Sequence, residues 1–422
     1  MSLKTVTVAD IAAPDKRSIA IGPFGSSLKA DLYVPSGVPV VRGQNIKDGG
    51  ELDESDLVFV EPETAARFPA CLLNEGDLVF PHRGAIGRVG IVGKRQMLLS
   101  SSMMKLTVDP LKADPRFVLY YFRGPGQNEL LMRASTVGTP GIGQPLTSLR
   151  GIPIQIPELD QQRAIAEVLG ALDDKIAANT RLTQTLDNYF MARWSALSEN
   201  DSLKQVKLTE LVGNVIGGDW GNSESTDTST EEVLCIRGAD IADLQGSGLG
   251  SMPRRFIKPT SLRRRRLAHM DLVVEMSGGS PTQSTGRVVL ITDAMLKRLP
   301  LPLSSSNFCR IVRLGNSQDA YFIYALLRES WTRGEFFQFE NGSTGIKNLA
   351  FADFCSSKEV RMPEQSHLQN FNRLADGLFM QMQSLGEESA HLRASRDALL
   401  PQLMSGKLRV KDAEKVLENA GV

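Results

Sequence analysis

The feature that most constrains the fold is an internal repeat, because the chain carries the same short motifs twice in the same order. Val38–Ile46 aligns with Val233–Ile241, 195 residues later, and both segments read V-x-x-[VI]-R-G-x-x-I. Asp77–Phe80 aligns with Asp271–Val274, 194 residues later. Motifs that recur in one order at a nearly fixed spacing are typical of a duplicated structural unit.

Four more pairs of segments continue the alignment through both halves. They are Gly87–Val89 with Gly286–Val288, Leu99–Ser102 with Leu303–Ser306, Phe117–Phe122 with Tyr321–Leu327, and Gly141–Ile142 with Gly345–Ile346. The spacing changes only between 194 and 204 residues, as loops of unequal length would cause. The 422 residues are enough for two or three domains, and we predict a tandem duplication.

Each half begins with short apolar runs separated by Gly, Pro and Asn, a pattern typical of strands and turns. Strands are expected at Val38–Val41, Asp77–Phe80, Val89–Val92 and Met104–Val108, and short helices at Arg116–Phe122 and Tyr321–Arg328. We therefore predict a mixed α/β fold for each half.

Each half ends with a heptad pattern, over Asp160–Ala196 and Glu364–Leu400. Its a and d positions are Ile165, Leu169, Leu172, Ile176, Asn179, Thr183, Leu186 and Phe190, then Leu368, Phe371, Ala375, Leu378, Met382, Leu385, Ser389, Leu392, Arg396 and Leu399. Such sustained spacing predicts a coiled-coil seam, in which a buried Asn179 would fix the register. Helices of 37 residues would each be about 55 Å long. The alternative is two unrelated helices, each packed on its own domain.

The predicted fold class is α+β, with two tandem mixed α/β domains separated by two long helices that pair as an antiparallel coiled coil. The domain in between gives the chain room to leave along one helix and return along the other. The expected boundaries are 1–157 for the first domain, 158–199 for the central helix, 200–362 for the second domain, 363–412 for the C-terminal helix and 413–422 for a tail.

The net charge is zero, with 48 basic and 48 acidic residues, whereas a freestanding nucleic-acid-binding protein is usually more basic. The charge is uneven, because Pro253–Arg313 holds twelve Lys or Arg against three acidic residues. This region includes the run Arg263–Arg266 and is either a solvated loop or a surface that faces phosphate groups.

The cysteines and the lengths of the apolar runs are typical of a protein without disulfide bonds or membrane-spanning segments. Cys71, Cys235, Cys309 and Cys355 form no CxxC pair, which predicts reduced structural thiols. Apolar runs are far shorter than the roughly 20 residues of a membrane span, and a cytoplasmic location is expected.

Signatures of catalysis are missing from the sequence. It has no GxxxxGK[ST] phosphate loop, no HExxH helix, no Asn/Asp-Pro-Pro-Tyr motif of amino-methyltransferases and no clear nuclease carboxylate cluster. Gly84, Gly87 and Gly90 precede a predicted strand rather than the helix of a dinucleotide site, so they indicate a tight turn. We therefore expect no catalytic residue, metal ion or cofactor in this chain, and predict a binding or scaffold subunit.

The whole set of motifs resembles the specificity subunit of type I restriction-modification systems. Gly22–Lys29 (GPFGSSLK) and Gly37–Ile46 resemble the start of that family's target recognition domain, Gly76–Gly90 its middle strand pair, Ile152–Ile176 its junction into the first spacer helix, and Leu399–Leu408 the end of the second. The second half departs from this pattern, since only Gly217–Gly221 stands where a GPFGS segment is expected.

The resemblance implies two target recognition domains, each reading one half of a split double-stranded DNA target. It also implies two methyltransferase (modification) subunits that use S-adenosylmethionine, and restriction and translocase subunits that use ATP and Mg²⁺. Partners would then share the phosphate contacts, which accounts for the neutral net charge. Helices of about 55 Å exceed the roughly 34–36 Å of one DNA turn, which suits half-sites about a turn apart.

Base reading favours side chains that form two hydrogen bonds, such as Arg with guanine and Asn or Gln with adenine. In the first half the candidates are Arg42, Gln44, Asn45, His82 and Arg83, with Lys29 on phosphate. In the second half they are Arg237, Arg263, Arg264, Arg265, Arg266, Gln283, Arg287, Asn341 and Lys347. The alternative for each is a surface charge or a turn-stabilising hydrogen bond. Arg42 and Arg237 occupy equivalent positions in the two halves. This favours a role in the structural framework that both halves share.

Three other functions stay open on the sequence. The first is a specificity subunit whose partner is a single methyltransferase–nuclease polypeptide. The second is a freestanding enzyme that modifies or cleaves DNA. The third is a coiled-coil scaffold that never touches DNA.

Overall fold

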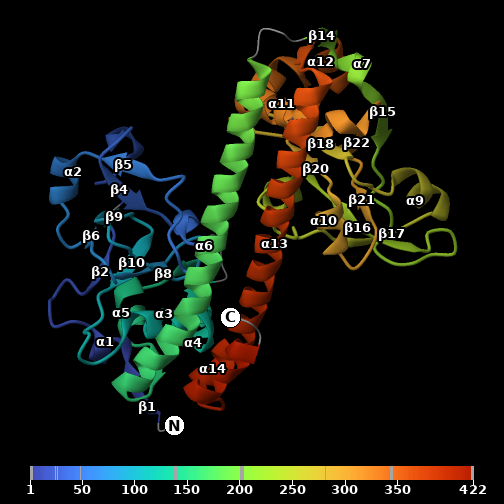
Figure 1. The fold of residues 1–422 in the computed structure, drawn as a ribbon. Coiled ribbons are helices and arrows are strands. Elements are labelled where there is room, and N and C mark those ends of the chain that lie inside the picture. Colours follow the sequence, from blue (N-terminus) through green and yellow to red (C-terminus); the bar gives the residue numbers. More distant parts are fainter. Residues whose placement is uncertain are drawn as a thin grey trace. The chain divides into compact units, whose positions relative to one another are not determined.

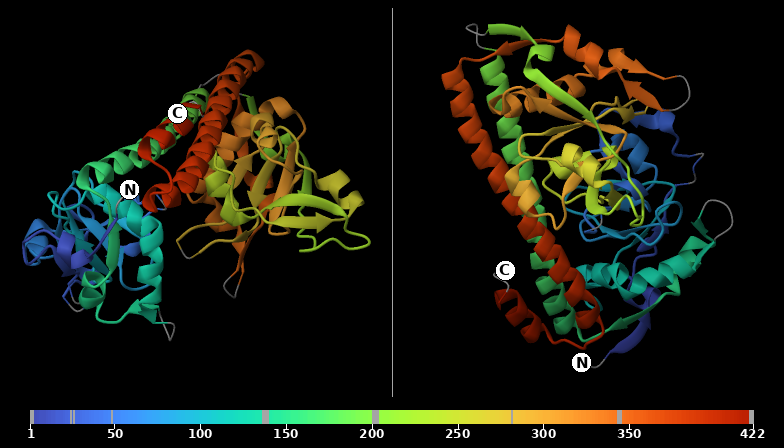
Figure 2. Two further views of the ribbon diagram at one scale, coloured as in Figure 1. Left: turned by 90° about the horizontal axis from the view of Figure 1, so that it is seen from below. Right: turned by 90° about the vertical axis from the view of Figure 1, so that its right-hand side faces the viewer.

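The computed structural model describes residues 3–23, 25, 27–47, 49–135, 140–199, 204–280, 282–342 and 346–419. Its helices and strands are drawn in Figures 1 and 2. The chain divides into two compact units: unit 1 comprises Met1–Lys175 and Leu392–Val422, and unit 2 comprises Ile176–His391. Within the described ranges, no helix is both long enough and apolar enough to cross a membrane.

Unit 1 contains two sheets. The five-stranded sheet runs in the order β3 (Tyr33–Val34), β5 (Val58–Val60), β4 (Val38–Val41), β9 (Met97–Leu99) and β6 (Leu72–Leu73). The four-stranded sheet runs in the order β2 (Ile19–Ile21), β10 (Met103–Leu106), β7 (Leu78–Pro81) and β8 (Gly90–Ile91). Val40 and Leu98 of the first sheet and Val79 of the second are fully buried in one shared core.

Two further strand pairs and several short helices complete unit 1. The pairs are β1 (Lys4–Thr7) with β13 (Pro153–Ile156), and β11 (Ala134–Ser135) with β12 (Gly141–Ile142). The helices are α1 (Val8–Ile11), α2 (Pro62–Ala66), α3 (Pro115–Arg123), α4 (Pro125–Met132) and α5 (Pro145–Arg150), with 3₁₀ turns η1 (Ala30–Leu32) and η2 (Gly43–Asn45). Helix α3 begins after Asp114, whose carboxylate accepts a hydrogen bond from the Phe117 amide at 2.9 Å, as an N-cap residue does.

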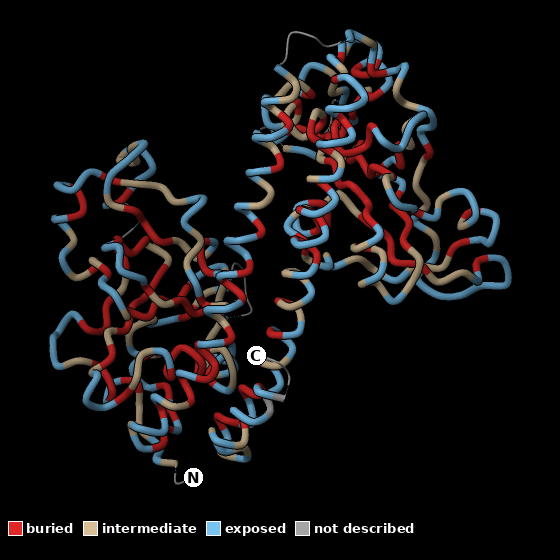
Figure 3. Tube along the Cα trace, viewed as in Figure 1, coloured by how far each residue is buried: buried red, intermediate tan, exposed pale blue. Residues whose placement is uncertain are grey.

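Unit 2 repeats this plan with larger insertions. Its sheets are β15 (Val212–Gly217), β22 (Cys309–Leu314), β18 (Leu272–Glu275) and β20 (Val288–Leu290); β17 (Arg254–Ile257), β16 (Glu231–Ile236) and β21 (Leu303–Ser305); β19 (Ser277–Gly278), β24 (Lys347–Leu349) and β23 (Glu340–Asn341); and β14 (Lys204–Lys207) with β25 (Glu359–Met362). Its short helices are α7 (Leu208–Leu211), α8 (Ile241–Gln245), α9 (Pro259–Arg265), α10 (Asp293–Lys297), α11 (Ala320–Thr332) and α12 (Phe351–Ser357), with 3₁₀ turns η3 (Gly238–Asp240), η4 (Ser317–Asp319) and η5 (Glu335–Phe339). In both units the buried residues lie on strands and on the helices packed against them, including α3 and α11, and Figure 3 marks them in red.

Strand pairing confirms the duplication and corrects one of its matches. Strand β4 runs parallel to β9, with Val41 opposite Leu99, and β16 runs parallel to β21, with Ile236 opposite Ser305. Because Val41 and Ile236 are equivalent in the repeat, Leu99 corresponds to Ser305 and not to Leu303. The alignment was wrong by two residues because both halves contain the sequence Leu-Ser-Ser-Ser. The register of a strand is set by its hydrogen-bonded pairing with the neighbouring strand and not by a short shared sequence.

The last match of the repeat is also shifted. The Ile142 amide donates to the His82 carbonyl at 2.9 Å, and in unit 2 the Leu349 amide donates to the Met276 carbonyl at 2.8 Å. Leu349 is therefore the counterpart of Ile142, where the sequence predicts Ile346. The predicted partner of Gly141, Gly345, lies outside the described residues.

The two long helices form the predicted antiparallel coiled coil. They are α6 (Leu159–Ser198) and α13 (Gln365–Met404). In unit 2 the Asn179 side-chain amide donates to Glu388 at 2.8 Å and to the Ser389 hydroxyl at 3.3 Å. Further along, the ring of Phe190 lies 5.2 Å from that of Phe379. Numbers rise on one helix as they fall on the other, and the alternative of two unrelated helices is wrong.

Most of the expected seam positions are buried. Only Leu186 and Leu385 of the eighteen a and d positions are half-buried, and the others are buried. The second helix ends at Met404, earlier than the expected boundary at residue 412, because Gly406 adopts a left-handed conformation at φ 69°. A further helix, α14 (Val410–Asn419), occupies most of the segment expected to be a tail.

Candidate nucleic-acid interface

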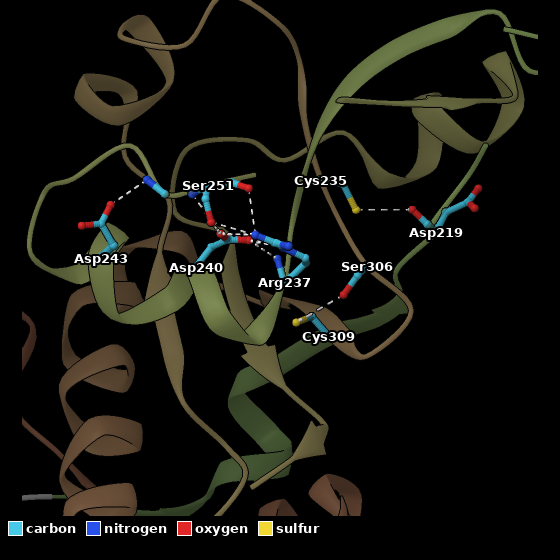
Figure 4. A network of polar contacts seen from close by, with 9 residues as sticks. Asp219, Cys235, Arg237, Asp240, Asp243, Ser251, Ser306 and Cys309 are labelled. Carbon is cyan, nitrogen blue, oxygen red and sulfur yellow. Dashed lines mark hydrogen bonds and ion pairs between the residues drawn. The ribbon is translucent and has the colours of Figure 1, made fainter. Parts of the chain in front are cut away.

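An arginine turn is built alike in both units. In unit 1 the Arg42 amide donates to the Asn45 side chain at 2.9 Å, and in unit 2 the Arg237 amide donates to the Asp240 carboxylate at 2.9 Å. The Arg42 guanidinium donates to the Asp56 carbonyl at 2.7 Å. The guanidinium of Arg237 forms two bonds of 3.0 Å with Asp240 (Figure 4). Both arginines are therefore used inside the turn, as expected for residues of the common frame.

The neighbours of these arginines differ in exposure. Asn45 is 1% exposed, and its amide also donates to the Asp56 carbonyl at 3.1 Å, which leaves it little to offer a base. Gln44 is exposed and donates to the Asp56 carboxylate at 2.5 Å. A DNA base would reach Gln44 more readily than Asn45, and both assignments stay predictions.

The two versions of this turn predict a difference in pH dependence. Burial opposes ionisation of Asp240, but hydrogen bonds from Arg237 and Ser251 more than offset it, so the pKa of this carboxyl lies below its usual value. Its contribution to stability is therefore complete above the unfolded-state pKa of about 3.9 and is lost as the pH falls through the folded-state pKa.

We expect Asp240→Asn to fold, because Asn45 holds the same position in unit 1. The variant should unfold at a lower temperature than the parent at pH 7, and the difference should shrink below about pH 4. Thermal unfolding at pH 7 and at pH 3.5 checks this. A constant difference between the two pH values would contradict it.

His82 and Arg83 follow strand β7 but differ in surroundings. His82 is 4% exposed, its Nε2 lies 3.1 Å from the Ser101 carbonyl, and burial lowers its pKa, so the ring is neutral at pH 7. Its buried Nδ1 has no hydrogen-bond partner in the described structure. Arg83 is exposed and forms a backbone bridge with Gly141, which places it beside the β11–β12 pair. Lys29 is exposed at the start of η1.

Two arginines of the basic region in unit 2, Arg287 just before β20 and Arg313 in β22, are paired with acidic residues. Arg287 contacts Glu275 at 2.6 Å, and Arg313 contacts Asp271 at 2.9 Å. Both carboxylates are nearly buried, with 3% and 5% of the side chain exposed. Arg287, one of the predicted DNA-binding residues, is thus already held by a structural carboxylate.

The arginine run itself behaves differently. Arg263, Arg264 and Arg266 are exposed, and in the described part of the chain their side chains form no hydrogen bond or ion pair. Arg265 instead donates to the Gly217 carbonyl at 2.8 Å and to the Ser261 hydroxyl at 3.0 Å. Three guanidinium groups on one end of α9 are therefore free to contact phosphate, and the fourth fixes the helix.

Helix α9 is attached to the loop that follows β15. The Ser261 hydroxyl donates to the Asp219 carboxylate, while the Arg255 guanidinium lies 4.5 Å from the ring centroid of Trp220. Arg255 also donates to the carbonyls of Trp220 and Gly221, both at 2.9 Å. The sequence did not single out Trp220 and Arg255, and only Gly217–Gly221 as a segment signalled this loop.

This loop is the counterpart of the GPFGS segment of unit 1. A Cβ on Gly22 would lie 1.8 Å from the Ser100 carbonyl oxygen, and a Cβ on Gly218 would lie 2.0 Å from that of Ser306. Both glycines therefore allow the same close backbone approach. Gly218 is therefore the structural counterpart of Gly22, although the sequence of unit 2 lacks a full GPFGS motif.

The remaining candidates of unit 2 gather on the sheet β19-β24-β23. Lys347 contacts the Glu340 carboxylate at 2.8 Å and donates to the Ser280 carbonyl at 3.0 Å. Asn341 is exposed on strand β23 of this sheet. Gln283 is exposed on the neighbouring turn, where its carbonyl accepts a hydrogen bond from the Ser280 amide. Lys347 therefore fixes this hairpin, while the side chains of Asn341 and Gln283 form no hydrogen bond with residues that the structure describes.

Metal and thiol chemistry find no support in the described residues. No group of three or more His, Cys, Asp or Glu among them is arranged to hold a metal ion. The four cysteines are buried and unpaired. Burial raises the pKa of Cys71, and raises those of Cys235, Cys309 and Cys355 to about 12 each, so all four thiols stay protonated.

Comparisons with known proteins agree with this architecture. The family model described as the type I restriction modification DNA specificity domain matches residues 25–188. The type I restriction enzyme MjaIX specificity subunit of Methanocaldococcus jannaschii is 23% identical over 360 residues, covering 80% of this chain and 79% of the relative. The putative type I restriction enzyme MjaX specificity subunit of the same organism is 28% identical over 158 residues, 36% of each chain.

A solved structure shares the fold along nearly the whole chain. The type I restriction-modification system S subunit from M. genitalium superposes with a TM-score of 0.54 at 14% identity, covering 95% of this chain and 96% of that one. This solved structure shows that the fold is shared, and the family model shows a DNA specificity domain over residues 25–188. The chain is similar to specificity subunits of type I restriction-modification systems.

Proposed function

We propose that this chain recognises a split DNA sequence and directs partner subunits to it. Unit 1 reads one half of the target and unit 2 reads the other. The observation that carries the proposal is the combination of a common frame with unlike loops, seen where η2 and η3 share an arginine turn but differ beyond it. A protein that reads two unlike half-sites needs one repeated support and two different surfaces.

The charges support a division between frame and contact residues. Arg287 and Arg313 have carboxylate partners, while Arg263, Arg264 and Arg266 are unpaired in the described structure. Phosphate contacts hold a protein in register on DNA, and contacts to base edges specify the sequence. We assign the free end of α9 to phosphate and the exposed Gln44, Arg83, Gln283 and Asn341 to base edges.

The partners in this proposal are two methyltransferase subunits and the restriction and translocase subunits. S-adenosylmethionine, ATP and Mg²⁺ belong to those partners, in the cytoplasm, where the DNA lies. The paired helices α6 and α13 separate the two recognition domains in the sequence, residues 1–157 and 200–362, where the expected helix boundaries were 158–199 and 363–412. A fused methyltransferase–nuclease partner would serve the same role.

The test is a map of methylated bases in DNA from cells that express this chain with its neighbouring methyltransferase, against the methyltransferase alone. A split motif that requires this chain supports the proposal. Exchange of either half with that of another specificity subunit should then change one half-motif and leave the other. An active methyltransferase with no chain-dependent motif would favour the scaffold alternative, and turnover by the purified chain alone would favour an enzyme.

A further inference from the structure

The segment 240–251 of unit 2 departs from its counterpart in unit 1. It contains α8 and a turn, whereas after η2 unit 1 has a β-bridge between Ile46 and Leu52. The end of the segment is joined to the arginine turn, because Asp240 of that turn accepts a hydrogen bond from the Ser251 amide at 3.0 Å. The Gly250 amide also donates to the Asp243 carboxylate at 2.7 Å (Figure 4). Both ends of the segment are therefore fixed to the candidate DNA-binding frame.

The apex of this turn lies on helix α13. Ser247 is 1% exposed, and its carbonyl oxygen lies only 2.0 Å from the position that a Cβ on Gly386 would occupy. The Arg298 guanidinium donates to the Ser247 carbonyl at 2.8 Å and to the Gln383 side chain at 2.5 Å. Gln383 in turn donates to the Ser247 hydroxyl at 3.3 Å. The missing side chain at Gly386 is what lets the turn reach the helix.

The contact between Ser247 and Gly386 involves residues in unfavourable conformations or surroundings. Ser247 adopts a left-handed conformation at φ 62°, which is uncommon for a residue other than glycine. One nitrogen of the Arg298 guanidinium is buried with no hydrogen-bond partner in the described structure, and burial lowers the pKa of this group. Strained residues persist where the surrounding structure fixes them, and they gather at functional positions.

We propose that the contact between Ser247 and Gly386 fixes the position of the unit 2 recognition fold on α13, and thereby the half-site spacing that the assembled complex accepts. The inference rests on the proposed function. Gly386 and Gln383 are positioning residues, because they act through the turn and not on DNA. A shift of the turn moves the arginine turn of Arg237 and Asp240, to which it is joined.

The direct test is Gly386→Ala, with Gly377→Ala as the matched control. Both glycines lie on α13, and a Cβ on Gly377 would meet no atom within 4 Å. Each replacement raises helix propensity by the same amount, so any effect of propensity is common to both. Only the Cβ on Gly386 forces the Ser247 carbonyl to move, by more than about 1 Å to reach normal contact.

The measurement is the methylation rate of the complex on DNA with unchanged half-sites and a spacer that is native, one base pair shorter or one base pair longer. We expect Gly377→Ala to keep the parent spacing profile. Gly386→Ala should lower the rate at the native spacing by up to about a hundredfold, since a misplacement of about 1 Å can have that effect. The preference for the native spacing should fall, while the half-site sequences stay the same.

A second variant keeps the test decisive if Gly386→Ala fails to assemble. Gln383→Leu removes the hydrogen bonds of Gln383 with Arg298 and with the Ser247 hydroxyl, and should broaden the accepted spacing. An unchanged spacing profile in the variants that assemble would overturn the inference. Failure of the proposed function is seen separately, because the parent complex would then methylate no split target at any spacing.

Discussion

Asp173→Ala is expected to lower the free energy of unfolding of unit 1 by about 3–5 kcal/mol, the effect of removing one partner from a buried ion pair. The Asp173 carboxylate contacts Arg123 and Arg396, each at 2.6 Å, and accepts a hydrogen bond from the Tyr120 hydroxyl at 2.8 Å. Both arginine side chains are only 9% exposed. After the substitution, among the residues that the structure describes, Arg123 forms no other ion pair, and Arg396 keeps only its pair with the exposed Asp397.

The neighbouring residue supplies the matched control. Asp174 contacts Arg116 at 3.3 Å, but these side chains are 63% and 52% exposed, so Asp174→Ala should change stability by no more than about 1 kcal/mol. Hydrogen exchange of unit 1 amides at increasing urea concentration measures the effect without assuming that both units unfold together. Equal losses for Asp173→Ala and Asp174→Ala would contradict the prediction.

The same carboxylate explains why the pairing of α6 and α13 is specified in unit 1. Asp173 lies on α6 and Arg396 on α13, while Tyr120 and Arg123 lie on α3. Burial, followed by the charge of Asp173, raises the pKa of Tyr120, which keeps its hydroxyl protonated as a donor. One carboxylate therefore joins three helices, and its loss should loosen their packing as well as remove a charge pair.

The duplication and the helix pair could be predicted because they rest on patterns that run along the chain. The heptads place apolar residues on one side of each helix, and motifs such as Arg42-Gly and Arg237-Gly mark equivalent turns. The alignment of Leu99–Ser102 with Leu303–Ser306 was wrong, because four identical residues fix the equivalent positions less reliably than the pairing of strands does. Parallel pairing of β16 with β21 places Ser305, two residues further on, in the equivalent position.

The candidate site was less predictable, because a sequence shows charges but not their partners. Arg287 and Glu275 are twelve residues apart, and Arg313 and Asp271 are 42 apart, so only the folded strands bring each pair together. Asn45 is polar in the sequence yet 1% exposed in the fold. The charge run of α9 was informative because a short helix cannot bury several adjacent arginines, which leaves some of them at the surface.

The triple replacement Arg263→Ala, Arg264→Ala and Arg266→Ala is expected to have the largest effect on DNA binding. Each phosphate contact releases counterions, so log K falls with log salt by about 0.9 per contact. Loss of three contacts should reduce this slope by up to about 2.7 and weaken binding at low salt for target and non-target DNA alike. Fluorescence anisotropy of the assembled complex between about 50 and 200 mM salt measures both quantities.

The matched control removes three positive charges elsewhere in unit 2, with Lys204→Ala, Lys297→Ala and Arg361→Ala. These side chains are exposed and have no ion pair within the described ranges, as is true of the three arginines of α9. If net charge alone governed binding, both triple variants would lose the same affinity and the same salt slope, and α9 would not be the phosphate contact. A loss confined to the α9 variant follows if Arg265 and the Trp220 loop fix this helix so that its three free guanidinium groups face the DNA backbone.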